Sequence, residues 1–182
     1  MKKYELTGEV KVKFGVTFKR IRALIDFGNV KKGELGGFIE KEENLSHENN
    51  AWVYDDAWVS GNAEGYDDAW VYGNAWVYGD AWVYGNAKVS GNARVSGNAE
   101  VSGNAEVSGN ADYVLIGRVG SRFGFTTFFR NKNNEIYVSC GCFLGTLAKF
   151  RKKVKETHGT DTKYAKVYQA AADLAEMQIL NK

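Results

Sequence analysis

The sequence predicts a mainly β protein whose central part is a solenoid of short parallel strands. Alanine recurs every six residues from Ala51 to Ala111, and a fixed short period is the sequence signature of a solenoid. Valine follows nearly every one of these alanines at the second position, and Gly-Asn or Gly-Asp closes most of the units. Proline is absent from the chain, which suits uninterrupted backbone pairing between successive coils.

Each unit has the form Ala-x-Val-y-Gly-Asn, and this spacing separates an inner face from an outer face. Ala and Val are two residues apart, so on an extended strand they share one face, while x and y share the other. The x and y positions change from Trp and Tyr in the first units to Lys, Arg, Glu and Ser in the later ones. Because a buried face must stay apolar, we expect Ala and Val inside the coil. The Gly-Asn pair supplies the left-handed backbone that a tight corner needs.

The pattern is irregular at the start of the solenoid. Gly65 stands where a Val is expected, which predicts a thin place in the core. Further upstream, Ile39 and Leu45 fall in the Ala phase of the repeat, and His47 falls in the Val phase. We therefore expect the first coil to begin near Ile39, with irregular turns.

The repeat pairs an aliphatic residue with a small residue four positions later, from Val53 with Ala57 up to Val107 with Ala111. In this the chain resembles the hexapeptide-repeat superfamily. The resemblance implies a left-handed parallel β-helix with three hexads in each triangular coil, and about three to four or more coils for this chain. It also implies assembly into a homotrimer.

Both flanks of the repeat predict ordered elements. Apolar and polar residues alternate before Gly15, and residues 18–25 form a second apolar-rich stretch. Residues 1–38 are therefore expected to form a β-hairpin cap, because the end of a solenoid must be covered. The solenoid itself is expected over residues 39–112.

After Ala111 the period ends, and residues 113–182 predict a small α+β domain. Thr146 is a suitable N-cap for a helix that Gly159 ends, and Asp161 or Thr162 opens a last helix with apolar residues at helical spacing. Before these helices, strands are expected over 113–119, 123–130 and 135–140.

Three segments also resemble a group of largely uncharacterised hexapeptide-repeat proteins carried by phages and prophages: Arg22–Asn50, Cys140–Leu147 and Lys155–Gly159. The resemblance implies a phage or prophage origin, an intracellular setting and the same β-helix. Members of the group are sometimes labelled transferases on their repeats alone, which is an argument from the fold and not from a site.

The charge of the chain is small overall but unevenly distributed. The formal net charge is +2, yet residues 51–112 carry two basic residues against nine acidic ones, and residues 113–182 carry twelve basic residues against five acidic ones. The basic domain indicates an anionic partner. The alternative is that the two halves complement each other in an oligomer or only limit aggregation.

The sequence predicts no association with a membrane. No stretch reaches the apolar length of a membrane span, and the first ten residues lack the apolar core of a secretory signal. The two cysteines, Cys140 and Cys142, are too close in sequence for an ordinary structural disulfide. We therefore expect a location in a reducing cytoplasm, which for a phage-encoded protein is that of the host cell.

The first candidate site is a belt of aromatic residues at the x and y positions. With eighteen residues in a coil, Trp52 is expected beside Trp70, and Trp58 beside Trp76. Exposed apolar patches mark interfaces, and Tyr and Trp dominate binding hot spots. We expect self-association or a foreign partner, with packing on the cap and simple stabilisation of the ladder as alternatives. The belt comprises Trp52, Trp58, Trp70, Trp76, Trp82, Tyr54, Tyr66, Tyr72, Tyr78 and Tyr84.

The second candidate site is a basic and aromatic segment in the C-terminal domain. Arg beside aromatic residues suits contact with a phosphate and stacking on a base, and residues 149–155 add positive charge. This predicts a nucleotide or nucleic-acid ligand. The alternative is that the Phe residues form core and the Lys residues a solvated helix face. The expected ligand-binding residues are Arg118, Arg122, Phe123, Phe125, Phe128, Arg130 and Lys132.

Metal binding and acyl transfer are weaker alternatives. Cys140, Cys142 and His158 are potential zinc ligands, but closed zinc sites need four ligands and space their cysteines more widely, so we expect no metal and no other cofactor. An acyltransferase of the hexapeptide type would need a catalytic His, and the only histidines are His47 and His158. No long loop interrupts the repeats, and no catalytic residue is assigned.

The sequence thus favours a non-enzymatic binding or scaffold protein of a phage or prophage. Its expected partner is a host protein or a nucleotide or nucleic-acid ligand, with inhibition of host defence as the outcome. The alternatives are an acyl-CoA-dependent acyltransferase and a structural spacer of the virion.

Overall fold

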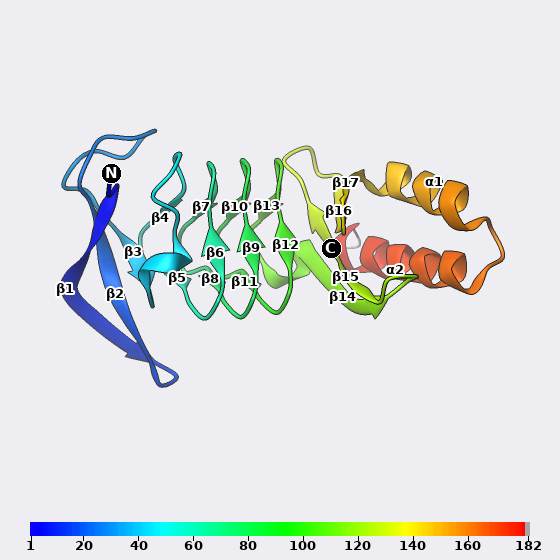
Figure 1. Cartoon of the computed structure of the whole chain (residues 1–182), viewed down its shortest axis with the longest axis horizontal. Coiled ribbons are helices and arrows are strands. Elements are labelled where there is room, and N and C mark those ends of the chain that lie inside the picture. The colour runs from blue at the N-terminus through cyan, green and yellow to red at the C-terminus, as the bar shows by residue number, and fades with distance from the viewer. Residues whose placement is uncertain (181–182) are drawn as a thin grey trace.

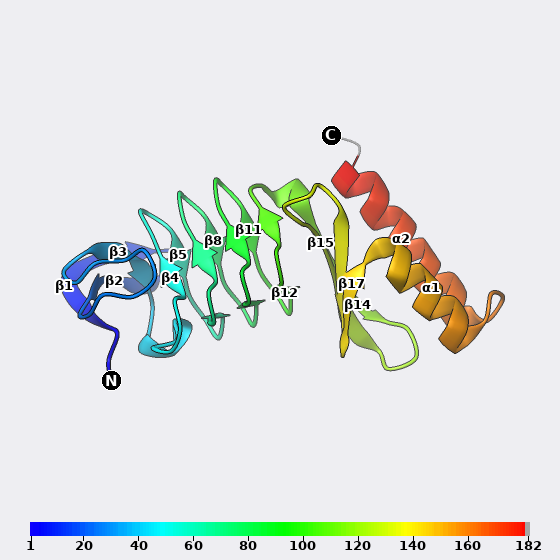
Figure 2. The same cartoon turned by 90° about the horizontal axis from the view of Figure 1, so that it is seen from above.

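The computed structural model describes residues 1–180 as an elongated molecule in three parts (Figure 1, Figure 2). An N-terminal cap, a solenoid shaft and a C-terminal head follow one another along the long axis, in the order of the sequence. The whole length of the shaft therefore separates the cap from the head.

The shaft is built from two-residue strands stacked in three parallel columns. Each strand is the x-Val pair of one hexad, with Gly65 in place of Val in β6, and strands eighteen residues apart pair in register, as Trp52 does with Trp70. The columns are β4-β7-β10-β13, β5-β8-β11 and β6-β9-β12. The strands are β4 Trp52–Val53, β5 Trp58–Val59, β6 Glu64–Gly65, β7 Trp70–Val71, β8 Trp76–Val77, β9 Trp82–Val83, β10 Lys88–Val89, β11 Arg94–Val95, β12 Glu100–Val101 and β13 Glu106–Val107. The predicted coil of three hexads is confirmed.

Ala and Val side chains fill the interior of the shaft. The repeat alanines from Ala51 to Ala105 are 0–2% exposed, and so are the repeat valines from Val53 to Val107. This confirms the predicted inner face. Each buried Val stabilises the coil by about 1.5–3 kcal/mol relative to an exposed one.

The corners of the shaft stack so closely that glycine is required. At Gly79 the backbone φ is +75°, and a Cβ atom there would lie 3.0 Å from the backbone nitrogen of Gly97 in the next coil. Beside the corners, amide and carboxylate side chains bond from coil to coil. Asn62 Nδ2, for example, donates to Asp80 Oδ1 at 3.1 Å. Backbone contact and side-chain ladders together fix the position of each corner.

The segment that leads into the first complete coil departs from the predicted phase. Ile39 pairs with Val59, which is twenty residues further along the chain. Leu45 likewise pairs with Gly65, whereas from Asn50 onward the offset between coils is eighteen residues. Two residues are therefore inserted between Leu45 and Asn50. Ile39 and Leu45 consequently occupy the Val column, and the prediction that they hold the Ala phase was wrong.

This insertion also resolves the gap at Gly65. The Cδ1 atom of Leu45 lies 3.6 Å from the point where a Cβ of Gly65 would be. The longer side chain of the preceding coil thus fills the place of the missing Val. His47 lies in the inserted stretch and is half-buried, so its predicted position in the Val phase was also wrong.

The cap extends one column of the shaft. Strands β1 (Tyr4–Lys13) and β2 (Val16–Ala23) form the predicted hairpin, and β3 (Leu35–Ile39), which was not predicted, pairs with both β2 and β5. The resulting sheet has the order β1-β2-β3-β5-β8-β11, and the hairpin projects to one side of the shaft in Figure 1. A 3₁₀ turn, η1 (Glu42–Asn44), follows β3.

The head begins with an antiparallel sheet that closes the end of the shaft. A 3₁₀ turn, η2 (Asn110–Asp112), leads into it. Phe129 packs with the core of the shaft, while Phe128 on the other face packs with the helices. The sheet comprises β14 (Tyr113–Val119), β15 (Gly124–Arg130), β16 (Ile136–Cys140) and β17 (Phe143–Thr146), in that order. The first three were predicted and β17 was not.

Helices α1 (Leu147–His158) and α2 (Lys163–Leu180) cover the outer face of this sheet (Figure 2). Thr146 accepts a hydrogen bond from the N–H of Lys149, and Gly159 ends α1 with a φ of +74°, as predicted. Thr162 Oγ1 accepts from a backbone N–H in the first turn of α2. Among residues 1–180 there is no helix with both the length and the apolar character needed to cross a bilayer.

Candidate functional site

The cap covers the tryptophans of the first coil. Trp52 is completely buried, with the rings of Tyr4 and Phe27 packed edge-on at 6.1 and 5.3 Å. Trp58 is 9% exposed and packs edge-on against Phe18 at 4.6 Å. The expectation that these two rings belong to an open outer belt was therefore wrong, because the cap folds over them.

Trp70 and Trp76, which follow Trp52 and Trp58 by one coil, are partly covered. Phe14, at the tip of the hairpin, stacks on Trp76 at 5.4 Å, and Trp76 Nε1 donates to Ser60 Oγ at 3.0 Å. Lys88 Nζ lies 5.4 Å from the centre of the Trp70 ring. Both rings lie beside their first-coil counterparts in the predicted register. The y-position residues Tyr54, Tyr72 and Tyr78 are half-buried.

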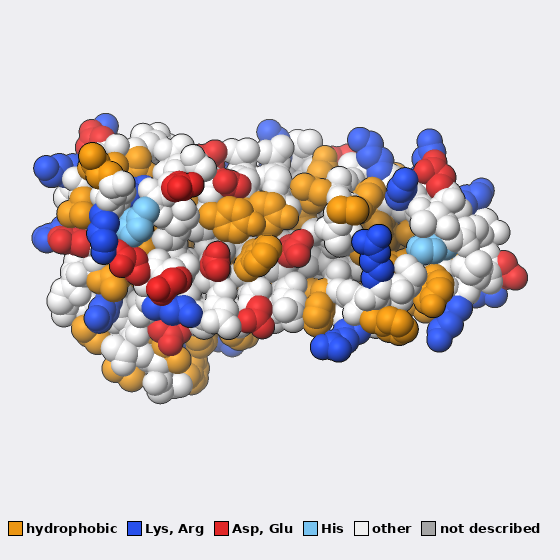
Figure 3. All heavy atoms as spheres, viewed as in Figure 1, with side chains coloured by type: hydrophobic (Ala, Val, Ile, Leu, Met, Phe, Trp, Pro, Cys, Tyr) orange, Lys and Arg blue, Asp and Glu red, His pale blue; other side chains and the backbone are white. Residues whose placement is uncertain are grey.

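Trp82 is the most exposed tryptophan of the shaft. It is 45% exposed and lies at 6.4 Å from Tyr66, which in turn stacks in parallel on Tyr84 at 5.0 Å. Burial, together with the neighbouring Tyr84, raises the pKa of Tyr66 to about 12, so its phenol stays neutral at physiological pH. We call these three residues the aromatic surface. They lie on the β6-β9-β12 column, where Figure 3 shows hydrophobic side chains with Asp and Glu around them.

A groove of about 500 Å³ passes Trp82 and reaches the head. Glu64 and Glu100 occupy the x positions on either side of Trp82 in the same column. Glu100 accepts a hydrogen bond from Ser139 Oγ at 2.8 Å. The groove is lined by Asn62, Glu64, Asp80, Trp82, Asn98, Glu100, Gly124, Phe125 and Gly141, so an exposed indole ring meets carboxylate groups there.

The predicted ligand-binding segment of the head does not assemble into one site. Phe128 is completely buried against Phe150, so it is core. Arg130 Nε donates to Asp112 Oδ1 at 3.0 Å, and another of its nitrogens donates to the carbonyl of Ile179. Arg130 therefore holds the end of α2 to η2, and the assignment of Phe128 and Arg130 to an open ligand surface was wrong.

The other predicted residues of this segment are divided among different surfaces. Arg118 and Phe123 are exposed. Lys132 lines a groove along the β4-β7-β10-β13 column, far from the α1–α2 side of the head. Only Arg122 and Phe125 line a common cavity.

This head cavity has a volume of about 310 Å³. It brings Cys140, Cys142 and His158 together as well, and the His158 ring stacks on Tyr168 at 5.7 Å. Cys140 Sγ accepts a hydrogen bond from Thr126 Oγ1 at 3.2 Å. No group of three or more potential ligands in residues 1–180 is arranged to hold a metal ion. The lining is Val119, Ser121, Arg122, Gly124, Phe125, Cys140, Gly141, Cys142, Phe143, Phe150, Lys153, Val154, Thr157, His158 and Tyr168.

Sequence reasoning missed several residues of both sites. Glu64 and Glu100 lie eighteen residues before and after Trp82, so the repeat period was a sufficient signal for them. Lys153 and Tyr168 reach the head cavity from two different helices, and no pattern within either helix reveals that they meet.

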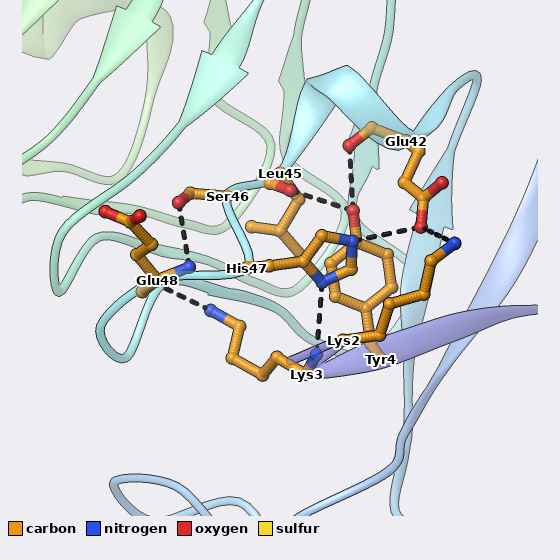
Figure 4. Close-up of polar contacts among 8 residues, drawn as sticks. All are labelled: Lys2, Lys3, Tyr4, Glu42, Leu45, Ser46, His47 and Glu48. Carbon is orange, nitrogen blue, oxygen red and sulfur yellow. Dashed lines mark hydrogen bonds and ion pairs between the residues drawn. The ribbon is translucent and has the colours of Figure 1, made fainter.

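His47 is the centre of a hydrogen-bonded cluster beneath the cap (Figure 4). Its Nδ1 accepts from the backbone N–H of Lys3 at 3.2 Å, so Nε2 carries the proton and donates to Glu42 Oε1 at 3.0 Å. The ring of Tyr4 stacks on the imidazole at 4.2 Å. A hydrogen bond from Lys2 and then one from His47 lower the pKa of Glu42. With both ring nitrogens engaged, His47 closes the first coil and has no free nitrogen for a substrate proton.

Comparison with known proteins shows that the sequence of the shaft is similar to that of other β-solenoids. The family model described as the YdcK β-solenoid repeat matches residues 69–85 and 87–103, which lie in the second and third coils. The shaft is a hexapeptide-repeat-like β-solenoid. A protein of Escherichia coli (strain K12) named uncharacterized acetyltransferase YdcK is 36% identical over 63 residues, which cover 30% of this chain and 19% of YdcK. The chain thus spans about a fifth of this relative.

Proposed function

We propose that this chain is a non-enzymatic binding protein in which the shaft is a rigid scaffold and the aromatic surface contacts a protein partner. The observation that carries the proposal is the exposure of Trp82. The other four tryptophans are covered or engaged by cap residues or shaft side chains, whereas Trp82 is 45% exposed beside a groove. Exposed Trp and Tyr clusters of this kind characterise binding hot spots.

The charges around the aromatic surface support a partner with cationic side chains. Glu64 and Glu100 flank Trp82 in register, and Asp80 lines the same groove. A Lys or Arg side chain placed there would gain attraction from the face of the indole ring and from the carboxylates. The shaft as a whole is acidic, which would steer such a partner towards it.

The setting of this binding is also a proposal. The resemblance of Arg22–Asn50 to phage-borne proteins supports action in the host cytoplasm, on a host protein, with inhibition of host defence as the outcome. The superfamily resemblance supports a homotrimer. In that assembly the β4-β7-β10-β13 column, which carries Lys88, would face the next copy, and the aromatic surface would stay open to the partner.

The test compares Trp82→Ser with Arg94→Ser, a substitution at the same outward position of another column. We expect the wild type and Arg94→Ser to retain a host protein from a lysate, and Trp82→Ser to lose it. The interaction should then be reconstituted from purified components, with a Kd at least tenfold weaker for Trp82→Ser. Light scattering of each variant separates self-association from a foreign partner. Equal retention by all three proteins would refute the role of the aromatic surface.

A second candidate function is acyl transfer, which the similarity to YdcK favours through the name of that protein. The geometry of His47 speaks against that residue as the base, because both ring nitrogens are engaged. A coupled thiol-release assay with acetyl-CoA and amine acceptors tests this candidate. If turnover persists in His47→Asn but disappears in His158→Asn, the acyl-transfer site would be assigned to the head cavity.

A further inference from the structure

The head cavity lies where three segments of the head converge. The β14–β15 connection and the start of β15 contribute Arg122 and Phe125. The end of β16 and the turn after it contribute the two cysteines, and α1 contributes Lys153 and His158. It adjoins the groove of the aromatic surface and shares only Gly124, Phe125 and Gly141 with it. It is therefore a separate compartment, and the proposed function makes no use of it.

The charged groups that line the cavity all have the same sign. Arg122 and Lys153 are its basic residues, His158 adds a titratable ring, and none of the described lining residues is Asp or Glu. The groove beside it has the opposite charge, because its charged lining residues are Glu64, Asp80 and Glu100.

Neither of these two cations has a carboxylate partner, unlike two of the arginines of the head. Arg151, two residues before Lys153 on α1, pairs with both Asp173 and Glu176, at 2.7 and 2.8 Å. Arg130 pairs with Asp112. Within residues 1–180, neither Arg122 nor Lys153 forms an ion pair of this kind. The head thus neutralises Arg130 and Arg151, whereas Arg122 and Lys153, which are both exposed, line the cavity without a carboxylate partner.

The remaining walls are apolar, with a few hydroxyl groups. Phe143, Phe150 and Val154 supply rings and methyl groups, and Phe150 is 3% exposed. Thr157 and Tyr168, which each carry a hydroxyl group, also line the cavity. A concave apolar surface with a few convergent polar groups is the usual character of a small-molecule site, and about 310 Å³ lies near the lower end of the usual size range.

We propose that the head cavity binds a small organic anion, with a phosphate or carboxylate group held by Arg122 and Lys153 and a compact aromatic or aliphatic body against Phe143 and Phe150. Arginine suits this role because its planar guanidinium group binds two oxygens of such an anion at once. Removing the anion from water onto an apolar floor strengthens its attraction to the two cations.

The experiment uses the full chain and phenyl phosphate as the probe, with isothermal titration calorimetry for affinity and NMR for the position of the site. We expect saturable binding of phenyl phosphate, weaker binding of inorganic phosphate, which lacks the apolar body, and no binding of benzylamine, which has the opposite charge. Chemical-shift changes should be concentrated on the rings of Phe150, His158 and Tyr168.

Two double variants separate a built site from general attraction to a basic domain. Arg122→Gln with Lys153→Met should weaken phenyl phosphate binding at least tenfold. Arg118→Gln with Lys149→Met removes the same charge from exposed positions outside the cavity on β14 and α1 and should leave the affinity within twofold. Circular dichroism confirms that each variant is folded. An equal loss in both variants, equally tight binding of benzylamine, or shifts confined to other parts of the head would overturn the proposal.

Discussion

Lys3 shows how a single charged side chain closes the first coil. It is 1% exposed, and its Nζ donates to the carbonyl oxygens of Glu48, Asn49 and Ala51 at 2.9–3.3 Å. Burial lowers the pKa of Lys3 to about 8, although the charge of Asp68 acts in the opposite direction. The ammonium group of Lys3 thus holds the segment with the two-residue insertion in place by hydrogen bonds. Burial in the fold makes this group easier to deprotonate.

The pKa of Lys3 predicts that the free energy of unfolding rises between about pH 8 and pH 10. In this window the unfolded chain still holds the proton at its ordinary pKa of 10.5 while the folded chain releases it, so stability increases with pH, by roughly 1–3 kcal/mol. Urea denaturation at half-unit pH intervals measures this. Lys3→Met should flatten the profile, and an unchanged profile in that variant would contradict the assignment.

At the scale of elements, the strongest packing constraint in the head is the contact of Gly120 with α2. A Cβ atom on Gly120 would lie 1.9 Å from the Oη of Tyr168, and its φ of +74° is unfavourable for other residues. The close approach seats α2 on the β14–β15 connection. The side chain of Tyr168 then forms one wall of the head cavity.

Gly120→Ala is therefore expected to destabilise the head by about 2–4 kcal/mol, from steric overlap and backbone strain. The α-helices lie only in the head and the tryptophans only at positions 52–82, so two signals separate the parts. The denaturation midpoint from circular dichroism at 222 nm should fall, while that from tryptophan fluorescence should change less. Gly124→Ala is the control, because no atom lies within 4 Å of its Cβ position.

The elements also show what the sequence could and could not predict. The hexads predicted every shaft strand, because the strict period fixes which residues face inward. The predicted phase was wrong at Ile39 and Leu45, because the repeat pattern does not reveal the insertion of two residues that follows them. In the head, the sequence placed Phe125 and Phe128 in one ligand-binding segment, because a sequence does not reveal that both faces of one sheet are covered. Phe128 and Arg130 were therefore misassigned to an open surface.

At the scale of the whole molecule, the repeat makes the shaft a spacer of adjustable length. The cap contacts the first two coils, and the head contacts the last coil and the strand that follows it. One further coil between these contacts would leave both ends unchanged. Each added coil lengthens the shaft by one strand spacing, about 4.8 Å.

Tandem duplication of Ala87–Asn104, which is one complete coil, is expected to give a folded protein. Small-angle X-ray scattering should show a maximum dimension longer by about 5 Å. The thermal midpoint should be at least that of the wild type, because three more valines become buried. A collapsed or aggregated product would show that the coils are not interchangeable.

The same geometry gives a different result for a change of only one hexad. Residues 99–104 and 105–110 have identical sequences. With a further copy of this hexad, the head would therefore pack on nearly the same residues as before. The added hexad would occupy one side of the triangle and not a whole circuit. The head would then rest about a third of a revolution away around the long axis, and Trp82 and Phe125 would no longer line one groove. The number of hexads in this protein therefore sets the rotation of the head about the long axis as well as the length of the shaft.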